Sequence, residues 1–242
     1  MPKKMMTLIA AGFLVAATAA LPSDVWKDKD FQNWDQKDVQ KILTDSPWSK
    51  KFEYSSAGTV GNSAMTHSVT TGPAGGGGNV PSDLGDRIAS NSQPGQQISL
   101  IVSWYSSRTI REAMARRKEL AGTSQDDARK ILSEEPTTYE VAVSGRGLTV
   151  FGEIQEDSLK EHSYLMSKIT KEKLAPAEVI VQRSQYDQPV AIIFEFAKTN
   201  ASGAPTIAKN EKGVEFFTQA GKTPVRIQFD LSKMMDKLGT DY

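Results

Sequence analysis

The sequence predicts an α+β fold built on a mostly antiparallel sheet, with a C-terminal strand meander and two or three helices packed on it. Helical patterns cluster between residues 109 and 166, strand patterns follow one another from 178 to 230, and another strand pattern precedes the helices at 98–105. Such segregation of helices from strands is typical of α+β proteins, whereas a doubly wound parallel sheet alternates the two.

The first residues have the pattern of a secretory signal peptide. Lys3 and Lys4 precede an uncharged apolar run over residues 5–18, and residues 17–19 (Ala-Thr-Ala) supply the small-x-small pattern of a cleavage site. The run is shorter than the roughly 20 residues that span a bilayer, which disfavours a membrane anchor. We therefore expect residues 1–19 to be removed, leaving a periplasmic or extracellular product without a transmembrane segment.

The composition excludes several classes of protein. The chain has 242 residues, 29 Lys and Arg against 29 Asp and Glu, two His and no Cys. Zero net charge disfavours a general nucleic-acid binder. The lack of Cys excludes disulfides, thiolate metal sites and a Cys nucleophile. Since two His cannot form a three-His site, we expect neither a metal nor a cofactor, and an exported chain without Cys fits a bacterial source.

Residues 20–54 form an aromatic-rich segment with one clear helix signal. Asp35 and Asp38 match a capping box, the apolar residues that follow share one helix face, and Pro47 ends the helix. The aromatic residues around this helix are Trp26, Phe31, Trp34 and Trp48. We expect these rings to anchor the helix on the core; an aromatic platform for sugars or peptides is the alternative.

Residues 55–97 change character. This stretch holds nine of the 18 Gly and only three charged residues. A composition of this kind cannot bury enough apolar surface to offset the entropy of ordering. We expect a flexible linker or an insertion at a hairpin tip, followed by the main α+β domain over 98–242.

The main domain opens with a strand and continues with helices. Residues 98–105 are apolar on both strand faces, which predicts a central strand, and a second strand is expected over 139–143. Three helices are expected, each opened by a capping box. The boxes are, in order, Thr109 with Glu112, Ser124 with Asp127, and Ser158 with Glu161. The third helix would carry His162 on its apolar face.

Four further strand patterns form the expected meander. The segments are 178–183, 190–197, 214–218 and 225–229. The last alternates Val225, Ile227 and Phe229 with polar residues, which is typical of a half-buried antiparallel strand. A short C-terminal helix over 231–238 completes the prediction.

Two carboxylates are the candidates for catalysis. The chain lacks the common phosphate-binding, nucleophile-elbow and zinc-protease motifs. Glu195 interrupts a strongly apolar strand, and Glu215 lies in the strand after it. Two carboxylates on neighbouring strands are the components of a glycosidase pair. The alternative is a surface ladder in which they pair with charges of the next strand, such as Arg226.

A basic cluster on the first helix of the main domain is the candidate binding site. Its members are Arg108, Arg111, Arg116, Arg117 and Lys118. Such a cluster suits an anionic glycan, a lipid headgroup or a phosphate. A solvated helix face, partly balanced by Glu112 and Glu119, is the alternative.

The segment from Trp34 to Lys50 resembles a group of exported bacterial proteins of acidobacterial type. The resemblance rests on Asp38, Val39, Ile42, Leu43 and Ser-Pro-Trp-Ser-Lys at 46–50, together with Ser103-Trp104 and Glu215-Phe216. It covers most of the expected mature chain outside 55–97. It implies export and a bacterial source, and it implies no activity or site, because none is known for the group.

These observations favour an exported, non-catalytic binding or interaction protein of the bacterial cell envelope. The expected partner is an envelope protein or an anionic glycan or lipid, and no nucleic acid is expected. The alternative is a carboxylate-dependent hydrolase centred on Glu195 and Glu215. A purely structural component of the envelope is the third hypothesis, since it also needs no catalytic motif.

Overall fold

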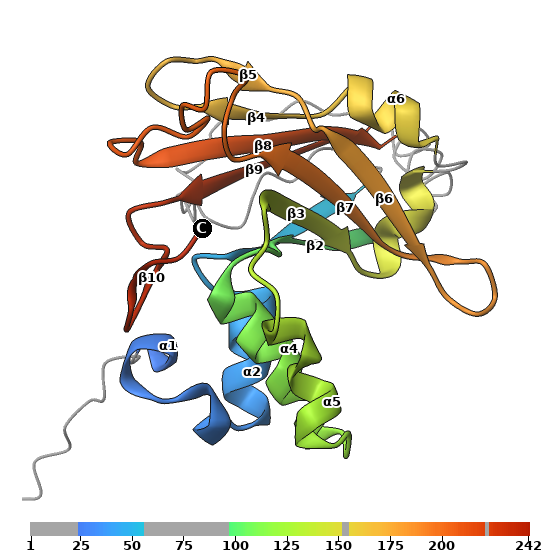
Figure 1. Ribbon diagram of the computed structural model, residues 1–242. Coiled ribbons are helices and arrows are strands. Elements are labelled where there is room, and N and C mark those ends of the chain that lie inside the picture. Colours follow the sequence, from blue (N-terminus) through green and yellow to red (C-terminus); the bar gives the residue numbers. More distant parts are fainter. Residues whose placement is uncertain (1–23, 56–96, 152–154, 221–222) are drawn as a thin grey trace, which may run out of the picture.

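The computed structural model describes residues 24–55, 97–151, 155–220 and 223–242 (Figure 1). The expected signal peptide lies outside these residues. So does the expected insertion, except for Ser55 and Gln97, which pair with each other at the ends of two adjacent strands.

Two antiparallel sheets carry the fold. The strands are β1 (Ser49–Ser55), β2 (Gln97–Trp104), β3 (Thr138–Ser144), β4 (Tyr164–Ser167), β5 (Lys173–Leu174), β6 (Glu178–Arg183), β7 (Pro189–Ala197), β8 (Gly213–Ala220), β9 (Thr223–Asp230), β10 (Met235–Asp236) and β11 (Gly239–Thr240). One sheet has the order β1-β2-β3-β7-β6 and the other β5-β4-β8-β9, while β10 and β11 form a small hairpin. The predicted α+β class with mostly antiparallel pairing is therefore confirmed.

The expected meander is divided between the two sheets. β6 and β7 form a hairpin in the five-stranded sheet, whereas β8 and β9 form a hairpin in the four-stranded sheet. The connection over 198–212 carries the chain from one sheet to the other. The sequence pattern of a strand shows how its side chains alternate, but it does not show which sheet the strand joins. The two hairpins were therefore predicted as one continuous meander.

The inner faces of the two sheets share one apolar core. Phe216 of β8 contacts Phe194 and Phe196 of β7, with ring centroids 5.1 and 6.4 Å apart. Trp104 of β2 contacts Phe229 of β9 at 5.3 Å. Side chains alternate along a strand, so the residues between these rings lie on the outer faces of the sheets.

The helices lie mostly to one side of the sheets. They are α1 (Val25–Asp28), α2 (Gln36–Thr44), α4 (Arg108–Leu120), α5 (Gln125–Arg129) and α6 (Glu156–Glu161), with 3-10 turns at Phe31–Asn33, Lys130–Leu132 and Arg146–Phe151. Figure 1 shows α1, α2, α4 and α5 grouped below the sheets, while α6 lies beside β6. None of the helices in the described ranges is both long and apolar enough to cross a membrane.

The predicted caps of α2 and α5 are confirmed. Asp35 accepts hydrogen bonds from backbone N–H groups of α2 while Asp38 completes the box, and Ser124 accepts from the N–H of Asp127. The tryptophans of the N-terminal segment are buried, and Trp26 meets Trp48 edge-on at 5.5 Å. They anchor the helices on the core, as expected, and present no open ring platform.

Three of the predicted helices differ from the structure in their ends or are absent from the described residues. The N-cap of α4 is Ser107, whose hydroxyl accepts from the N–H of Ile110, so Thr109 lies inside the helix. The third helix, α6, begins at Glu156 after the N-cap Gln155, so Ser158 lies inside it and does not cap it. The helix ends at Glu161, and β4 follows because its residues pair with β8 and enter the shared core. His162 is therefore exposed after α6. In place of a helix over 231–238, the chain forms a turn and the β10–β11 hairpin.

Candidate functional site

The structure does not bring Glu195 and Glu215 together. Phe194 and Phe196 point into the core from β7, so Glu195 between them points outward from the five-stranded sheet. Phe216 points into the same core from β8, so Glu215 points outward from the four-stranded sheet. Carboxylates on the two outer faces of a sandwich cannot act on one bond.

Glu215 is held by the neighbouring strand. It accepts from Arg226 Nη1 at 2.5 Å and from Gln228 Nε2 at 3.0 Å, both on β9. Its side chain is almost fully covered by these partners. This is the cross-strand ladder that the sequence offered as the alternative to catalysis.

Glu195 lies in a row of three glutamates across three strands. Its direct neighbours in register are Glu140 on β3 and Glu178 on β6. Burial and the charge of Glu178 raise the pKa of Glu195, and burial and the charge of Glu195 raise the pKa of Glu140. A shallow cavity of about 430 Å³ borders Glu140 and Glu195. Across the described ranges, no group of three or more acidic or His side chains is placed to hold a metal ion.

Most side chains of the predicted basic cluster are engaged in hydrogen bonds and ion pairs within the protein. Arg108 donates to Asp236 at 2.6 and 2.8 Å. The Arg111 guanidinium is buried and donates to the carbonyl of Ile131 at 2.9 Å.

Arg116 also faces inward, because its Nε donates to the carbonyl of Trp34 at 2.9 Å and its Nη1 to Glu119 at 3.0 Å. Of the five predicted binding cations, only Arg117 and Lys118 are exposed, while the other three are buried or half-buried. Two neighbouring charges on a solvated helix are a weaker case for anion binding than five.

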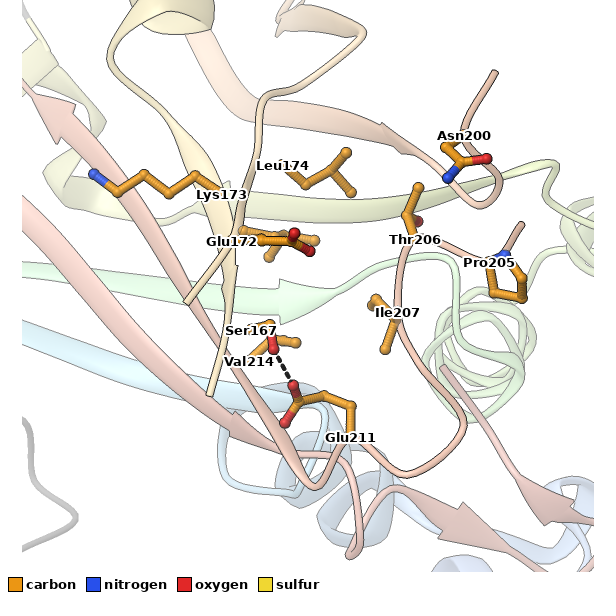
Figure 2. Close-up of a pocket in the computed structure, with 11 residues that line it drawn as sticks. Ser167, Glu172, Lys173, Leu174, Asn200, Pro205, Thr206, Ile207, Glu211 and Val214 are labelled. Atoms are coloured by element: carbon orange, nitrogen blue, oxygen red, sulfur yellow. Dashed lines mark hydrogen bonds between the residues drawn. The ribbon is translucent and has the colours of Figure 1, made fainter. Parts of the chain in front are cut away.

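A cavity of about 420 Å³ opens between the β4–β5 hairpin, the 199–211 connection and the start of β8 (Figure 2). Its lining combines an apolar floor with polar groups from both loops. The residues are Leu165, Ser167, Glu172, Lys173, Leu174, Asn200, Pro205, Thr206, Ile207, Glu211 and Val214. Mixed lining of this kind is typical of sites for small molecules.

Glu211 organises the walls of this cavity. Its buried carboxylate accepts from the Ser167 hydroxyl and from the backbone N–H groups of Ile169, Lys212 and Gly213, the last three at 3.3, 3.0 and 3.1 Å. Burial alone would raise the pKa of Glu211, but these hydrogen bonds outweigh it and lower the pKa. The carboxylate is therefore charged and its acceptor sites are occupied.

Ser167 and Glu211 do not form a nucleophile and base. The Ser167 oxygen accepts from the N–H groups of Ile169 and Thr170, at 3.2 and 3.0 Å, while its proton is directed at Glu211. A carboxylate with a lowered pKa is a weak general base. The hydrogen bonds of the pair hold the two loops that line the cavity.

Other polar groups in the cavity keep capacity for a ligand. Figure 2 shows the exposed Glu172 carboxylate pointing into the space between the loops, whereas Lys173 points away from it. The Asn200 carbonyl oxygen is occupied by Ser202 and Ala204, which leaves its amide N–H groups as donors. The Thr206 hydroxyl donates to the Ala197 carbonyl and keeps its acceptor capacity.

No signal in the sequence points to this cavity. Ser167 and Glu211 are separated by 44 positions and belong to no recognisable motif. From sequence alone, a glutamate in a Lys-rich connection is predicted to be a solvated charge. Glu211 is buried only because its segment packs against the end of β4 and the loop that follows it. Comparison with models of protein families, with curated proteins and with solved structures found no match to this chain, so any statement of function rests on these residues.

Proposed function

We propose that this chain is an exported, non-catalytic binding protein of the bacterial cell envelope, and that its cavity takes a small ligand bearing hydroxyl or amine groups. The observation that carries the proposal is the preformed cavity around Glu211. Its walls are fixed by six hydrogen bonds to or from Ser167 and Glu211 that need no ligand. Ligand binding to a site that is already organised carries only a small entropic cost, because few side chains and loops have to be ordered.

The free groups of the cavity define the class of ligand. Glu172 can accept from a hydroxyl or amine, the Asn200 amide can donate to an oxygen, and Leu174 and Ile207 offer apolar contact. A saccharide or an amino sugar presents this combination of polar edges and apolar ring faces. An anionic ligand is disfavoured, because Glu172 faces the cavity and Lys173 does not (Figure 2).

Features of the chain outside the cavity support the envelope location. The two lysines, the apolar run over 5–18 and the small residues at 17–19 are the parts of a signal peptide. Intact mass of the protein recovered from its producing cell tests export. We expect a mature chain starting near Ala20, and a chain that retains Met1 would contradict it.

A ligand screen tests the cavity. We expect a mono- or disaccharide or an amino sugar to shift NMR signals of Leu174 and Ile207. Glu172→Gln should weaken that binding by about tenfold, since it replaces a charged hydrogen-bond acceptor with a neutral one. The matched control is Glu178→Gln, which removes an exposed glutamate on the five-stranded sheet. Equal loss in both variants, or shifts confined to other surfaces, would refute the cavity assignment.

A further inference from the structure

Two loops at one end of the four-stranded sheet carry a concentration of lysines. Lys168 and Lys171 lie between β4 and β5, Lys173 starts β5, and Lys209 and Lys212 precede β8. All five are exposed, and none of them forms an ion pair within the part of the chain that the structure describes. We call this set the lysine edge.

The buried Glu211 carboxylate holds the two loops of the lysine edge together. It binds Ser167 and Ile169 of one loop and Lys212 and Gly213 of the other. The N–H of Lys168 also donates to the carbonyl of Gly213 at 3.2 Å. The Lys168 side chain crosses directly over Gly213, where a Cβ would lie 3.0 Å from its Cδ. The lysines are therefore presented from a fixed platform.

The acidic groups near the lysine edge do not neutralise it. Glu211 is buried and fully hydrogen-bonded, as described above. Asp230, at the end of β9, is engaged by the Ser232 hydroxyl at 2.5 Å and by Lys233 at 3.6 Å. Glu172 is the exposed carboxylate of the same hairpin loop, and it points into the cavity (Figure 2). The surface left to solvent is positively charged and complements an anionic one.

An exposed aliphatic side chain lies in the middle of the lysine edge. Ile169 is 55% exposed, between Lys168 and Lys171 at the turn of the hairpin. Its backbone N–H is held by Ser167 and Glu211, so the loop is fixed while the side chain faces water. Peripheral proteins use such an arrangement at bilayers: the apolar side chain enters the boundary between headgroups and acyl chains, and the lysines bind lipid phosphates.

The adjoining sheet face argues against ligands that stack on aromatic rings. Tyr164 and Phe217 stack on each other with ring centroids 4.9 Å apart. The Lys173 ammonium lies over the Tyr164 ring at 4.2 Å, and the Arg226 guanidinium lies over the Phe217 ring at 5.0 Å. Nucleic-acid bases and sugars bind aromatic side chains through open ring faces, and these faces are occupied. A polysaccharide also offers no apolar interior for Ile169.

We propose that the lysine edge docks the protein on an anionic lipid bilayer, with Ile169 entering the boundary between headgroups and acyl chains. Docking goes beyond the proposed cavity function and does not depend on the cavity's ligand. Docking would hold the mouth of the cavity close to the membrane, because Glu211 organises both the cavity walls and the loops of the lysine edge.

Vesicle flotation tests this proposal. The chain is used from Ala20, since the apolar run at 5–18 would itself enter a bilayer. We expect binding to phosphatidylglycerol vesicles that weakens steeply with salt, and little binding to phosphatidylcholine vesicles. The double variant Lys168→Glu, Lys171→Glu should lower partitioning by more than about 30-fold, the loss expected for two lysines near an anionic surface.

Matched variants separate docking from general charge attraction. Arg117→Glu with Lys118→Glu changes the net charge equally on the exposed part of α4 and should leave binding within about twofold of wild type. Ile169→Ser should weaken binding by about tenfold through lost apolar burial. The same change at Leu120, 45% exposed at the end of α4, should have no effect. Circular dichroism confirms that each variant is folded.

Three outcomes would overturn the proposal. The first is the absence of binding to phosphatidylglycerol vesicles. The second is an equal loss in the two charge-reversal variants, which would mean attraction without a defined face. The third is loss on reversal of Lys168 and Lys171 with no effect of Ile169→Ser, which would assign the lysine edge to an anionic polymer in place of a bilayer.

Discussion

The carboxyl group of Glu112 lies among other charged groups at the start of α4. Burial raises its pKa to about 7, and the nearby carboxylates of Asp236 and Asp241 act in the same direction. Arg108 and Arg111 oppose the shift without reversing it. Near neutral pH this single residue therefore changes its charge inside the folded protein.

This shift predicts a pH-dependent effect of Glu112→Gln. The pKa of Glu112 in the folded protein lies above its ordinary value of 4.5. The contribution of Glu112 to the free energy of unfolding is therefore fully present below about pH 4.5 and is lost as the pH rises through about 7. The variant should be more stable than wild type at pH 8, by about 1–2 kcal/mol. This is less than the full shift implies, because solvent screens a partly exposed side chain.

Thermal unfolding at pH 5 and pH 8 measures this effect. At pH 5 the two proteins should unfold within about 0.5 kcal/mol of each other, since Glu112 is then mostly protonated. Glu172→Gln serves as the control, because Glu172 is exposed. A gain that is the same at both pH values would contradict the assignment to Glu112 ionisation.

At the scale of elements, α4 receives its N-terminal cap from a distant part of the chain. The Asp241 carboxylate accepts from the backbone N–H of Arg108 at 2.7 Å and of Thr109 at 2.9 Å. The Ser107 hydroxyl accepts from the next free N–H, that of Ile110. A negative charge at this position also interacts favourably with the helix dipole.

Removal of this cap should destabilise the protein. We expect Asp241→Ala to lower the free energy of unfolding by about 2 kcal/mol, the upper end of the usual range for caps, because the site is buried. Asp241→Asn keeps one acceptor oxygen and should lie between wild type and Asp241→Ala. Urea unfolding measures the series, with Asp126→Ala in the exposed first turn of α5 as the control. A cost no larger than that of the control would show that Asp241 does not cap α4.

The cap of α4 also illustrates what the sequence could predict. The box at Asp35 and the N-cap at Ser124 were predicted correctly because both partners lie within one turn of the helix. Thr109 and Glu112 have the same spacing, yet Ser107 and Asp241 provide the cap. The alternation of β9 was read correctly for the same local reason, as its inward residues follow one another at every second position.

Features that depend on distant partners could not be read in this way. A periodic run over 158–166 favoured one helix, but pairing of β4 with β8 decides its second half. The cavity could not be predicted, and the basic cluster was predicted as a binding surface, for the same reason. Glu211 is buried by contacts with a loop some 40 positions away, and Arg116 is turned inward by the carbonyl of Trp34, 82 positions away.

At the scale of the whole molecule, the helices and both sheets contribute to one apolar cluster. It extends from Trp26 and Ile42 of the helices through Val102 and Phe194 of one sheet to Phe229 of the other. A shared core predicts that the described parts unfold together.

Unfolding should therefore be a single cooperative transition. Far-UV circular dichroism reports on the sheets and helices. Tryptophan fluorescence reports on the packing around four buried rings, those of Trp26, Trp34 and Trp48 on the helical side and that of Trp104 between the sheets. The two signals should give the same midpoint within about 0.2 M urea, as two-state unfolding requires. Phe216→Ala, between the sheets, should shift both midpoints equally, whereas separate shifts would indicate two independently folding units.

The bond between Trp48 and Asp241 has a consequence for the speed of folding. The Trp48 indole donates to the Asp241 carbonyl across 193 positions, and the same residue caps α4 across 133 positions. Contacts that close such long loops form late in folding, because the chain loses the entropy of loop closure before the contacts contribute any stabilising energy. The helical layer is thus completed only after the overall topology exists. A chain built in this way stays open for longer before it folds, which would suit the export proposed above.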